Sequence, residues 1–145
     1  MTEAAIDRAL VRRRLNYLLE TVRTLHKFQG VPVERLQETV TAWAVQHGLQ
    51  LAVQAVVDVA SHVVASLGGR VGDQYRDNLL QLGELGVLPP DFARRIAPMA
   101  GLRNILVHEY LAVDLREVHR VLNHHLDDLV AFAAYVDEFL ERASS

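Results

Sequence analysis

Apolar residues recur at helical spacing along almost the whole chain, and no segment alternates with the two-residue period of a strand. The first stripe predicts a helix with Thr2 as its N-cap. It consists of Ile6, Leu10, Leu15, Leu18, Val22 and Leu25. Gly30 and Pro32 then break the chain and separate this helix from the next.

Residues 33–67 are predicted to form one long second helix after Pro32, which suits a first-turn position. The stripe continues without a phase slip through Leu36, Val40, Ala44, Gly48, Leu51, Ala55 and Val59. The alternative is a break at Gly48, since glycine costs a helix about 1 kcal/mol relative to alanine.

Gly68 and Gly69 are expected to end the long helix. Asp73 is the expected cap of a third helix, whose inner face consists of Tyr75, Leu79, Leu82 and Leu85. Residues 86–90, with the sequence Gly-Val-Leu-Pro-Pro, should form the turn that follows.

Asp91 can help to start a fourth helix, in which Pro98 should remove one backbone donor and produce a kink. A final helix is expected over residues 115–142, capped by Asp114, with the stripe Val118, Leu122, His125, Leu129, Phe132, Val136 and Leu140. The prediction is an all-α, up-and-down bundle of four to five helices. With 145 residues and no linker or low-complexity segment, residues 1–145 should form a single domain.

Composition narrows the classes of function. A formal net charge of -3 and a pI near 6.1 argue against a generally basic protein that coats nucleic acid. The chain has no cysteine, which excludes disulfides, thiolate metal sites and cysteine nucleophiles. The most apolar stretch, residues 49–67, contains the polar residues Gln50, Gln54, Asp58, Ser61 and His62, and the N-terminus lacks the uninterrupted apolar core of a secretory signal. We therefore expect a cytoplasmic protein that does not bind membranes.

Arginine, amide, imidazole, carboxylate and phenol groups cluster in the segment Arg103-Asn104-Ile105-Leu106-Val107-His108-Glu109-Tyr110. An arginine fork matches phosphate oxygens, and a histidine can move a proton near neutral pH. That pair is the minimum for cleaving RNA without a metal. From residue types alone, a helix end with a capping histidine and an ion-paired arginine remains the alternative.

The segment Met99–Tyr110, followed by Val113-Asp114, resembles the signature of the HepT-like proteins, a branch of the HEPN superfamily. Their motif is R-x-x-x-x-H-x-Y, usually with asparagine after the arginine, and this chain matches each place. Residues 49–62 are similar to the second helix of the family, and residues 86–89 resemble the turn before the motif helix. The resemblance covers residues 40–140.

This resemblance implies a metal-independent endoribonuclease that is the toxin of a toxin–antitoxin pair and acts as a homodimer on an RNA substrate. Its partner would be a minimal nucleotidyltransferase antitoxin of the MntA type. Arg103 and His108 match the catalytic residues, and Tyr110 matches the tyrosine that the antitoxin silences by AMPylation. Asn104 would support the cleft. The other function left open is a non-catalytic partner of the nucleotidyltransferase that holds a nucleotide or substrate.

A polar line on the predicted long helix is the second candidate feature, formed by Gln50, Gln54, Asp58 and His62 at intervals of four residues. Asp58 could orient Arg103 or His108, and His62 could line the same cleft; the alternative is a solvated stripe. Trp43 is expected to pack between helices or in a dimer interface.

No metal or cofactor is expected. His108-Glu109 begins like a zinc-protease helix, but the position four residues after His108 is Ala112. His124 with Asp127, and His125 with Asp128, have metal-compatible spacing, although His125 lies on the apolar stripe and more readily packs there. Arg94 and Arg95 could extend a phosphate track toward the cleft.

Overall fold

The computed structural model describes residues 6–108 and 114–143, and at positions 107 and 108 it describes the backbone alone. This part of the chain is helical throughout and contains no strand. The α-helices are α1 (Arg8–Leu25), α2 (Thr39–Ser66), α3 (Tyr75–Glu84), α4 (Pro90–Ile96), α5 (Met99–His108), α6 (Leu115–His124) and α7 (Leu126–Ala143). Two 3-10 turns, His26–Phe28 and Val33–Gln37, lie between α1 and α2.

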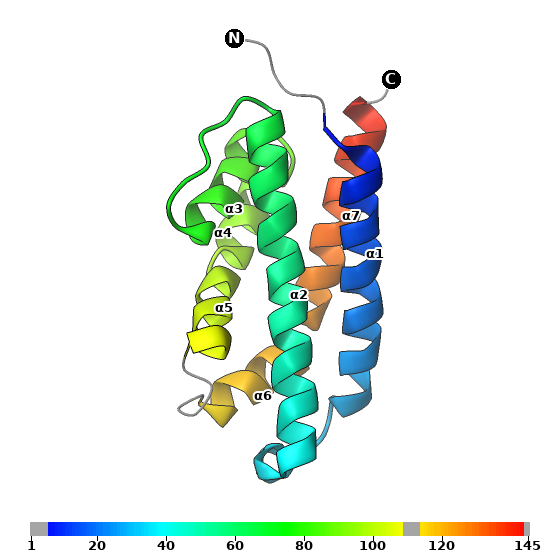
Figure 1. The fold of residues 1–145 in the computed structure, drawn as a ribbon, viewed down its shortest axis with the longest axis vertical. Helices are drawn as coiled ribbons and strands as arrows, with labels where there is room; N and C mark the ends of the chain where they lie inside the picture. Colours follow the sequence, from blue (N-terminus) through cyan, green and yellow to red (C-terminus); the bar gives the residue numbers. More distant parts are fainter. Residues whose placement is uncertain (1–5, 109–113, 144–145) are drawn as a thin grey trace.

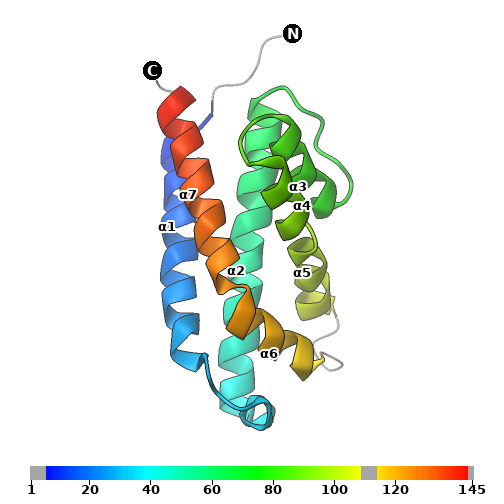
Figure 2. The same ribbon diagram turned by 180° about the vertical axis from the view of Figure 1, so that it is seen from behind.

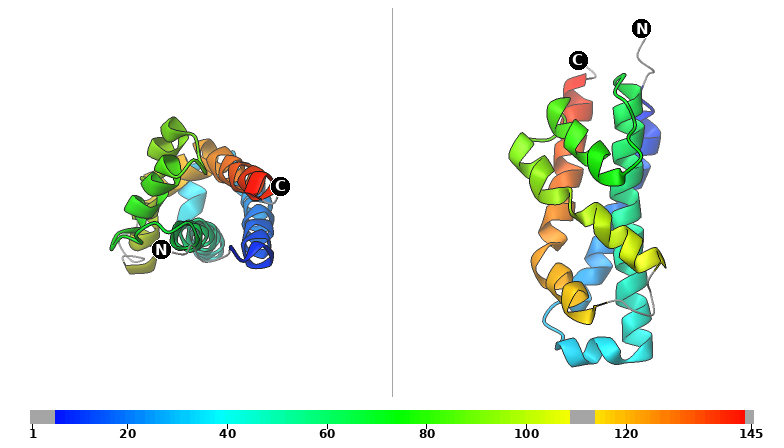
Figure 3. Two further views of the ribbon diagram at one scale, coloured as in Figure 1. Left: turned by 90° about the horizontal axis from the view of Figure 1, so that it is seen from above. Right: turned by 90° about the vertical axis from the view of Figure 1, so that its left-hand side faces the viewer.

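The helices form an up-and-down bundle around α2, which confirms the predicted fold class. In Figure 1, α1 descends, α2 ascends, α4 and α5 descend beyond α3, and α7 ascends after α6 has crossed the base of the bundle. Helix α2 packs against α1, α3, α5 and α7, and α1 also packs against α7 (Figure 2). Seen from above in Figure 3, α2 lies between α1 on one side and α5 on the other. A residue on α2 can therefore contact either neighbour, depending on its face.

The second predicted helix is continuous through Gly48, but it begins later and its buried face agrees only in part with the predicted stripe. Glu38 has an extended backbone (φ -68°, ψ 130°), which separates the 3-10 turn Val33–Gln37 from α2. Of the predicted stripe, Leu36, Ala55 and Val59 are buried, but the inward positions of the first half of α2 are Val45, Leu49 and Ala52, each one residue later than predicted. Val40 and Trp43 are 76% and 72% exposed, so Trp43 does not pack between helices of this chain.

Helix α2 is also long and apolar enough to cross a membrane, as judged by length and composition only. More than half of its most apolar window, 56%, is buried inside the bundle. The buried core helix of a soluble protein has the same length and composition, so this property alone is weak evidence for a membrane span.

Several predicted helix ends are wrong. The N-cap of α1 is Asp7, whose Oδ1 accepts from the backbone N–H of Leu10 at 3.0 Å. Thr2, the predicted cap, lies outside the described residues. Gln74, not Asp73, precedes α3. Gly68, with φ of 77°, follows the last turn of α2 as predicted, because a positive φ favours glycine.

The fourth and final predicted helices are each divided in two. Pro98 does not kink one helix: α4 ends at Ile96 and α5 begins at Met99. Proline has no backbone N–H to continue the ladder of α4, and its carbonyl instead accepts from Gly101 N in the first turn of α5. The final helix starts after Asp114, which caps Arg116 N as predicted, but it breaks at His125 into α6 and α7.

Candidate functional site

Helix α5 presents one face to the core and another to solvent. Met99, Leu102 and Leu106 are buried, and α5 packs against α2 and α3. Gly101 and Asn104 are exposed on the other side, and Arg103 is half-buried between the two faces. The buried residues fix the helix, and so they fix the direction in which Arg103 leaves it.

The Arg103 guanidinium is held by three contacts from different elements. Its Nε donates to Gln54 Oε1 of α2 at 2.9 Å, and its Nη1 donates to Asn104 Oδ1 at 3.3 Å. Its Cζ lies 5.2 Å from the ring centroid of Tyr75, the first residue of α3. The last contact is a cation–π interaction. Among the described residues, no carboxylate lies within ion-pair distance of this guanidinium, so its charge is not neutralised there.

Gln54 is oriented by Asp58. The Nε2 amide of Gln54 donates to Asp58 Oδ1 at 2.8 Å, one turn further along α2. A carboxylate accepts and an arginine only donates, so the amide has one arrangement that satisfies both partners. A chain of two hydrogen bonds therefore links Asp58 to Arg103 through Gln54. Sequence reasoning placed Gln54 on the polar line but missed its direct contact with Arg103; the signal was its spacing of four residues from Asp58.

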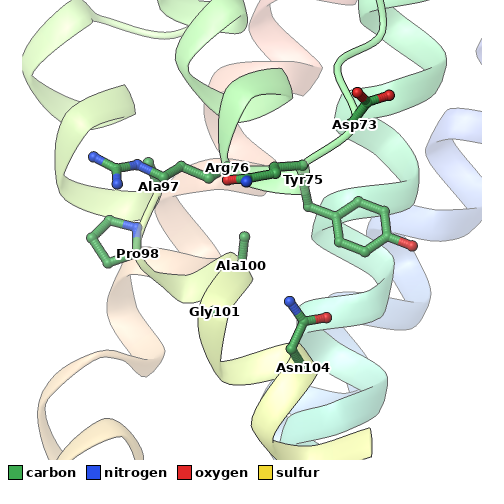
Figure 4. A pocket seen from close by; sticks show the side chains of 9 residues that line it. Asp73, Tyr75, Arg76, Ala97, Pro98, Ala100, Gly101 and Asn104 are labelled. Atoms are coloured by element: carbon green, nitrogen blue, oxygen red, sulfur yellow. The ribbon is translucent and has the colours of Figure 1, made fainter. Parts of the chain in front are cut away.

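A pocket of about 600 Å³ adjoins this arginine. Asp73, Gln74, Tyr75 and Arg76 line it from the start of α3, and Ala97, Pro98, Ala100, Gly101 and Asn104 line it from α5 and the turn before it. In Figure 4, Asn104 points up into this space from α5, below Tyr75. Tyr75 and Asn104 both contact Arg103, so the pocket and the arginine form one continuous surface.

The remaining predicted site residues lie elsewhere or are only partly described. His108 is the last residue of α5, five positions after Arg103, and its backbone alone is described. Tyr110 lies outside the described residues. His62 contacts α1, where its Nε2 accepts from the backbone N–H of Asp7 at 3.3 Å. With Asp58 it lines a separate cavity of about 210 Å³ beside α1, so the structure does not bring His62 to Arg103.

His125 is part of a charged network at the break between α6 and α7. Arg120 Nη1 donates to His125 Nε2 at 2.6 Å, so the ring proton lies on Nδ1, which faces Asp128 Oδ2 at 3.2 Å. Arg95 donates to the other carboxylate oxygen of Asp128. Burial raises the pKa of Asp128, but the hydrogen bonds from Arg95 and His125 outweigh burial and hold it below its usual value.

This network occupies His125 and Asp128, one of the two pairs that sequence spacing had suggested as a metal edge. Within residues 6–108 and 114–143, no group of three or more His, Asp or Glu side chains is placed to hold a metal ion. Arg94 and Arg95 pair with Asp91 and Asp128, which leaves them less available for phosphate contacts than expected.

Comparison with known proteins agrees with this architecture. The sequence model of the family described as "Ribonuclease HepT-like" matches residues 18–136. A protein named tRNA nuclease HepT from Aphanizomenon flos-aquae is 28% identical over 142 residues, which cover 93% of this chain and 92% of that protein.

Two solved structures share the fold. One is the cytosolic protein of unknown function YutE from Bacillus subtilis, with a TM-score of 0.84 and 18% identity, covering 97% of this chain and 94% of that chain. The other is a tri-AMPylated HEPN toxin of Shewanella oneidensis in complex with an MNT antitoxin, with a TM-score of 0.78 and 23% identity. It covers 88% of this chain and 96% of that chain. At these identities the likeness concerns the fold.

Proposed function

This chain belongs to the HepT-like ribonuclease family, and from that membership we propose that it is an endoribonuclease toxin of the HepT/MntA type. The observation that carries the proposal is the Arg103 guanidinium, held by Gln54 beside an open pocket with no described carboxylate to neutralise it. A fixed cation at an open surface suits the stabilisation of negative charge on a phosphate. The relative from Aphanizomenon flos-aquae, named a tRNA nuclease, supports the same reaction class.

The proposed reaction is an internal transfer at phosphorus. The RNA 2′-oxygen bonds to the adjacent phosphorus while the bond from phosphorus to the 5′-oxygen breaks. The 2′-hydroxyl loses its proton and the departing 5′-oxygen gains one, which yields a 2′,3′-cyclic phosphate and a 5′-hydroxyl. Arg103 stabilises the extra negative charge at phosphorus, and His108 moves a proton as acid or base or orients the hydroxyl. Asn104 supports Arg103 through its Oδ1.

We further propose that the reaction needs no metal and that residues 1–145 act as a single-domain homodimer in the cytoplasm. In a dimer, two copies of Arg103 would concentrate positive charge in one cleft, which would let a chain with a net charge of -3 bind RNA. Light scattering on the purified chain tests the dimer.

Regulation is proposed to act at Tyr110, through a nucleotidyltransferase antitoxin that attaches AMP groups. The phosphodiester would add negative charge and bulk two residues from His108, where the RNA phosphate must lie. The antitoxin complex of the Shewanella oneidensis toxin, described as tri-AMPylated, supports this proposal. Mass spectrometry after incubation with the antitoxin and ATP, compared with Tyr110→Phe, tests it.

The nuclease assignment is tested by expressing the chain alone and following growth and RNA integrity. Arg103→Ala and His108→Ala are expected to abolish both effects, whereas Arg23→Ala, at an exposed arginine of α1, should behave like the unaltered chain. Equal toxicity of all four proteins would overturn the catalytic assignment. Tight nucleotide binding by the purified protein without RNA cleavage would favour the non-catalytic binding partner instead.

A further inference from the structure

The pocket beside Arg103 has the size and lining of a ligand site. Its volume of about 600 Å³ falls within the range of small-molecule clefts, about 300–1,000 Å³. Figure 4 shows Arg76 and Tyr75 pointing away from each other along its upper rim, with Ala100 and Gly101 below them. Because the Arg103 guanidinium lies over the Tyr75 ring, the two arginines mark different ends of the pocket.

Gly101 leaves open space that the fold does not use. Apart from its chain neighbours and the backbone of its own helix, no atom of the described residues lies within 4 Å of the Cβ that another residue would carry at this position. Gly48 and Gly83 differ, because a Cβ there would meet Leu25 at 2.8 Å and Ala93 at 2.9 Å, so these glycines serve helix packing. Glycine weakens a helix relative to alanine. Packing within this chain therefore gives no reason for glycine at position 101, whereas a ligand in the pocket would.

The side chains around this space suit a nucleotide. Arg76 makes no hydrogen bond or ion pair with any described residue, so its charge is available to a phosphate. Two carboxylates are near it in the chain: Asp73 lines the same pocket, and Asp77 follows Arg76 in sequence. The exposed Asn104 amide retains its two N–H donors, since its Oδ1 accepts from Arg103. Those donors can pair with the edge of a base.

We propose that this pocket binds one unstacked ribonucleotide of a single-stranded RNA, next to the phosphodiester held by Arg103. The inference rests on the proposed nuclease function and adds a substrate class to it. The base lies against Ala100 and Gly101 with its edge toward Asn104, and Arg76 contacts the phosphate on the far side from Arg103. A duplex cannot place a base there, because recognition of an unpaired base requires it to be splayed out of its stack.

The experiment fills the pocket without altering either arginine. Gly101→Leu places a large side chain in the open space, and Gly101→Ala is the smaller step that adds one methyl group there. Binding of a fluorescent 2′-O-methyl oligoribonucleotide, which lacks the attacking hydroxyl, is measured by anisotropy against a duplex of the same sequence and against free AMP. Arg76→Gln is compared with Arg23→Gln over a series of salt concentrations. Thermal unfolding and light scattering verify the folding and assembly of each variant.

Gly101→Ala should bind the single strand more weakly than the unaltered chain, because its methyl group enters the space of the base, and Gly101→Leu should bind it about tenfold more weakly, the loss expected for one base contact. Arg76→Gln should reduce the slope of log affinity against log salt by about 0.7, the loss of one phosphate contact on a single strand. Arg23→Gln should leave that slope unchanged.

Equal affinities for Gly101→Leu and the unaltered chain would overturn the subsite. Free AMP that competes at the same concentration as the oligonucleotide would show a site for mononucleotides instead. A Gly101→Leu protein that changes its assembly state but not its RNA affinity would show a protein interface. A chain that binds as expected but cleaves no RNA would overturn the proposed nuclease and leave the subsite standing.

Discussion

Replacing Gln54 tests whether α2 positions the arginine of α5. Gln54→Ala removes the acceptor of the 2.9 Å hydrogen bond from Arg103 Nε and frees the guanidinium to adopt other rotamers. The contacts with Tyr75 and Asn104 remain, so Arg103 stays on the same surface. The change therefore removes orientation and leaves the charge in place.

The size of the effect follows from the hydrogen bond. Bonds to charged groups contribute about 1.5–3 kcal/mol, and the lower end applies here because Arg103 is half-buried and water can replace the lost acceptor. About 1.5 kcal/mol corresponds to a decrease of roughly tenfold in kcat/KM. If Gln54 only positions the guanidinium for the transition state, most of this loss should appear in kcat. Asp58→Asn leaves Gln54 in place and removes only the carboxylate that orients its side-chain amide. We therefore expect a smaller decrease in kcat/KM, of about threefold or less.

The assay is cleavage of a labelled oligoribonucleotide under single-turnover conditions, with thermal unfolding as the stability measurement. Gln50→Ala is the matched control, since Gln50 is the same residue type one turn earlier on α2 and no hydrogen bond joins it to Arg103. An NMR signal from the Arg103 Nε–H, protected from exchange in the unaltered chain and lost in Gln54→Ala, reports the contact without any activity. Equal rates for Gln54→Ala and Gln50→Ala would refute the positioning role.

Three further predictions concern stability and metal removal. Asp128→Asn should lower the free energy of unfolding by about 1–3 kcal/mol near neutral pH, as it weakens the hydrogen bond from Arg95. Since the folded-state pKa of Asp128 is lowered, this difference should be complete above about pH 4, the unfolded-state pKa, and should disappear as the pH falls through the lower folded value; urea titrations at several pH values measure it. Gly101→Ala should raise the free energy of unfolding by up to about 1 kcal/mol, whereas Gly83→Ala should lower it by about 1–3 kcal/mol because its Cβ would lie 2.9 Å from that of Ala93. EDTA in excess should leave the rate of RNA cleavage unchanged, and loss of activity that Mg²⁺ restores would contradict the metal-free mechanism.

Hydrophobic spacing predicted the helices well and their interruptions poorly. The stripe of the final segment is buried as predicted at Val118, Leu122, Leu129 and Phe132. The helix breaks at His125, yet the apolar spacing of α7 follows that of α6 almost without a shift. The sequence pattern therefore shows no interruption at this residue. At this break Asp128 contacts both His125 and Arg95 of α4, and the pairing with Arg95 joins residues 33 positions apart, which local spacing does not encode.

The candidate site was predictable in type but not in its partners. The segment from Arg103 to His108 was found because several reactive groups lie close together in sequence. Its contact with Gln54 joins residues 49 positions apart and depends on which face of α2 meets α5. Each step of four residues rotates by about 40° around a helix, so a line that begins toward α5 at Gln54 has turned toward α1 by His62. Two residues of one predicted polar line thus serve different neighbours.

The acidic net charge of the chain is compatible with RNA binding, because several arginines are neutralised in ion pairs whereas no described carboxylate neutralises Arg103. Arg12, Arg94, Arg95 and Arg120 each lie within ion-pair distance of an aspartate or glutamate, so their fields largely cancel. Arg103 has no such partner among residues 6–108 and 114–143, and it faces the pocket surface. RNA affinity should therefore depend on a few local contacts, and its salt dependence should be shallow, with a slope close to 0.7 per phosphate bound. A steep slope, equivalent to many phosphates, would show that a wider surface binds the strand.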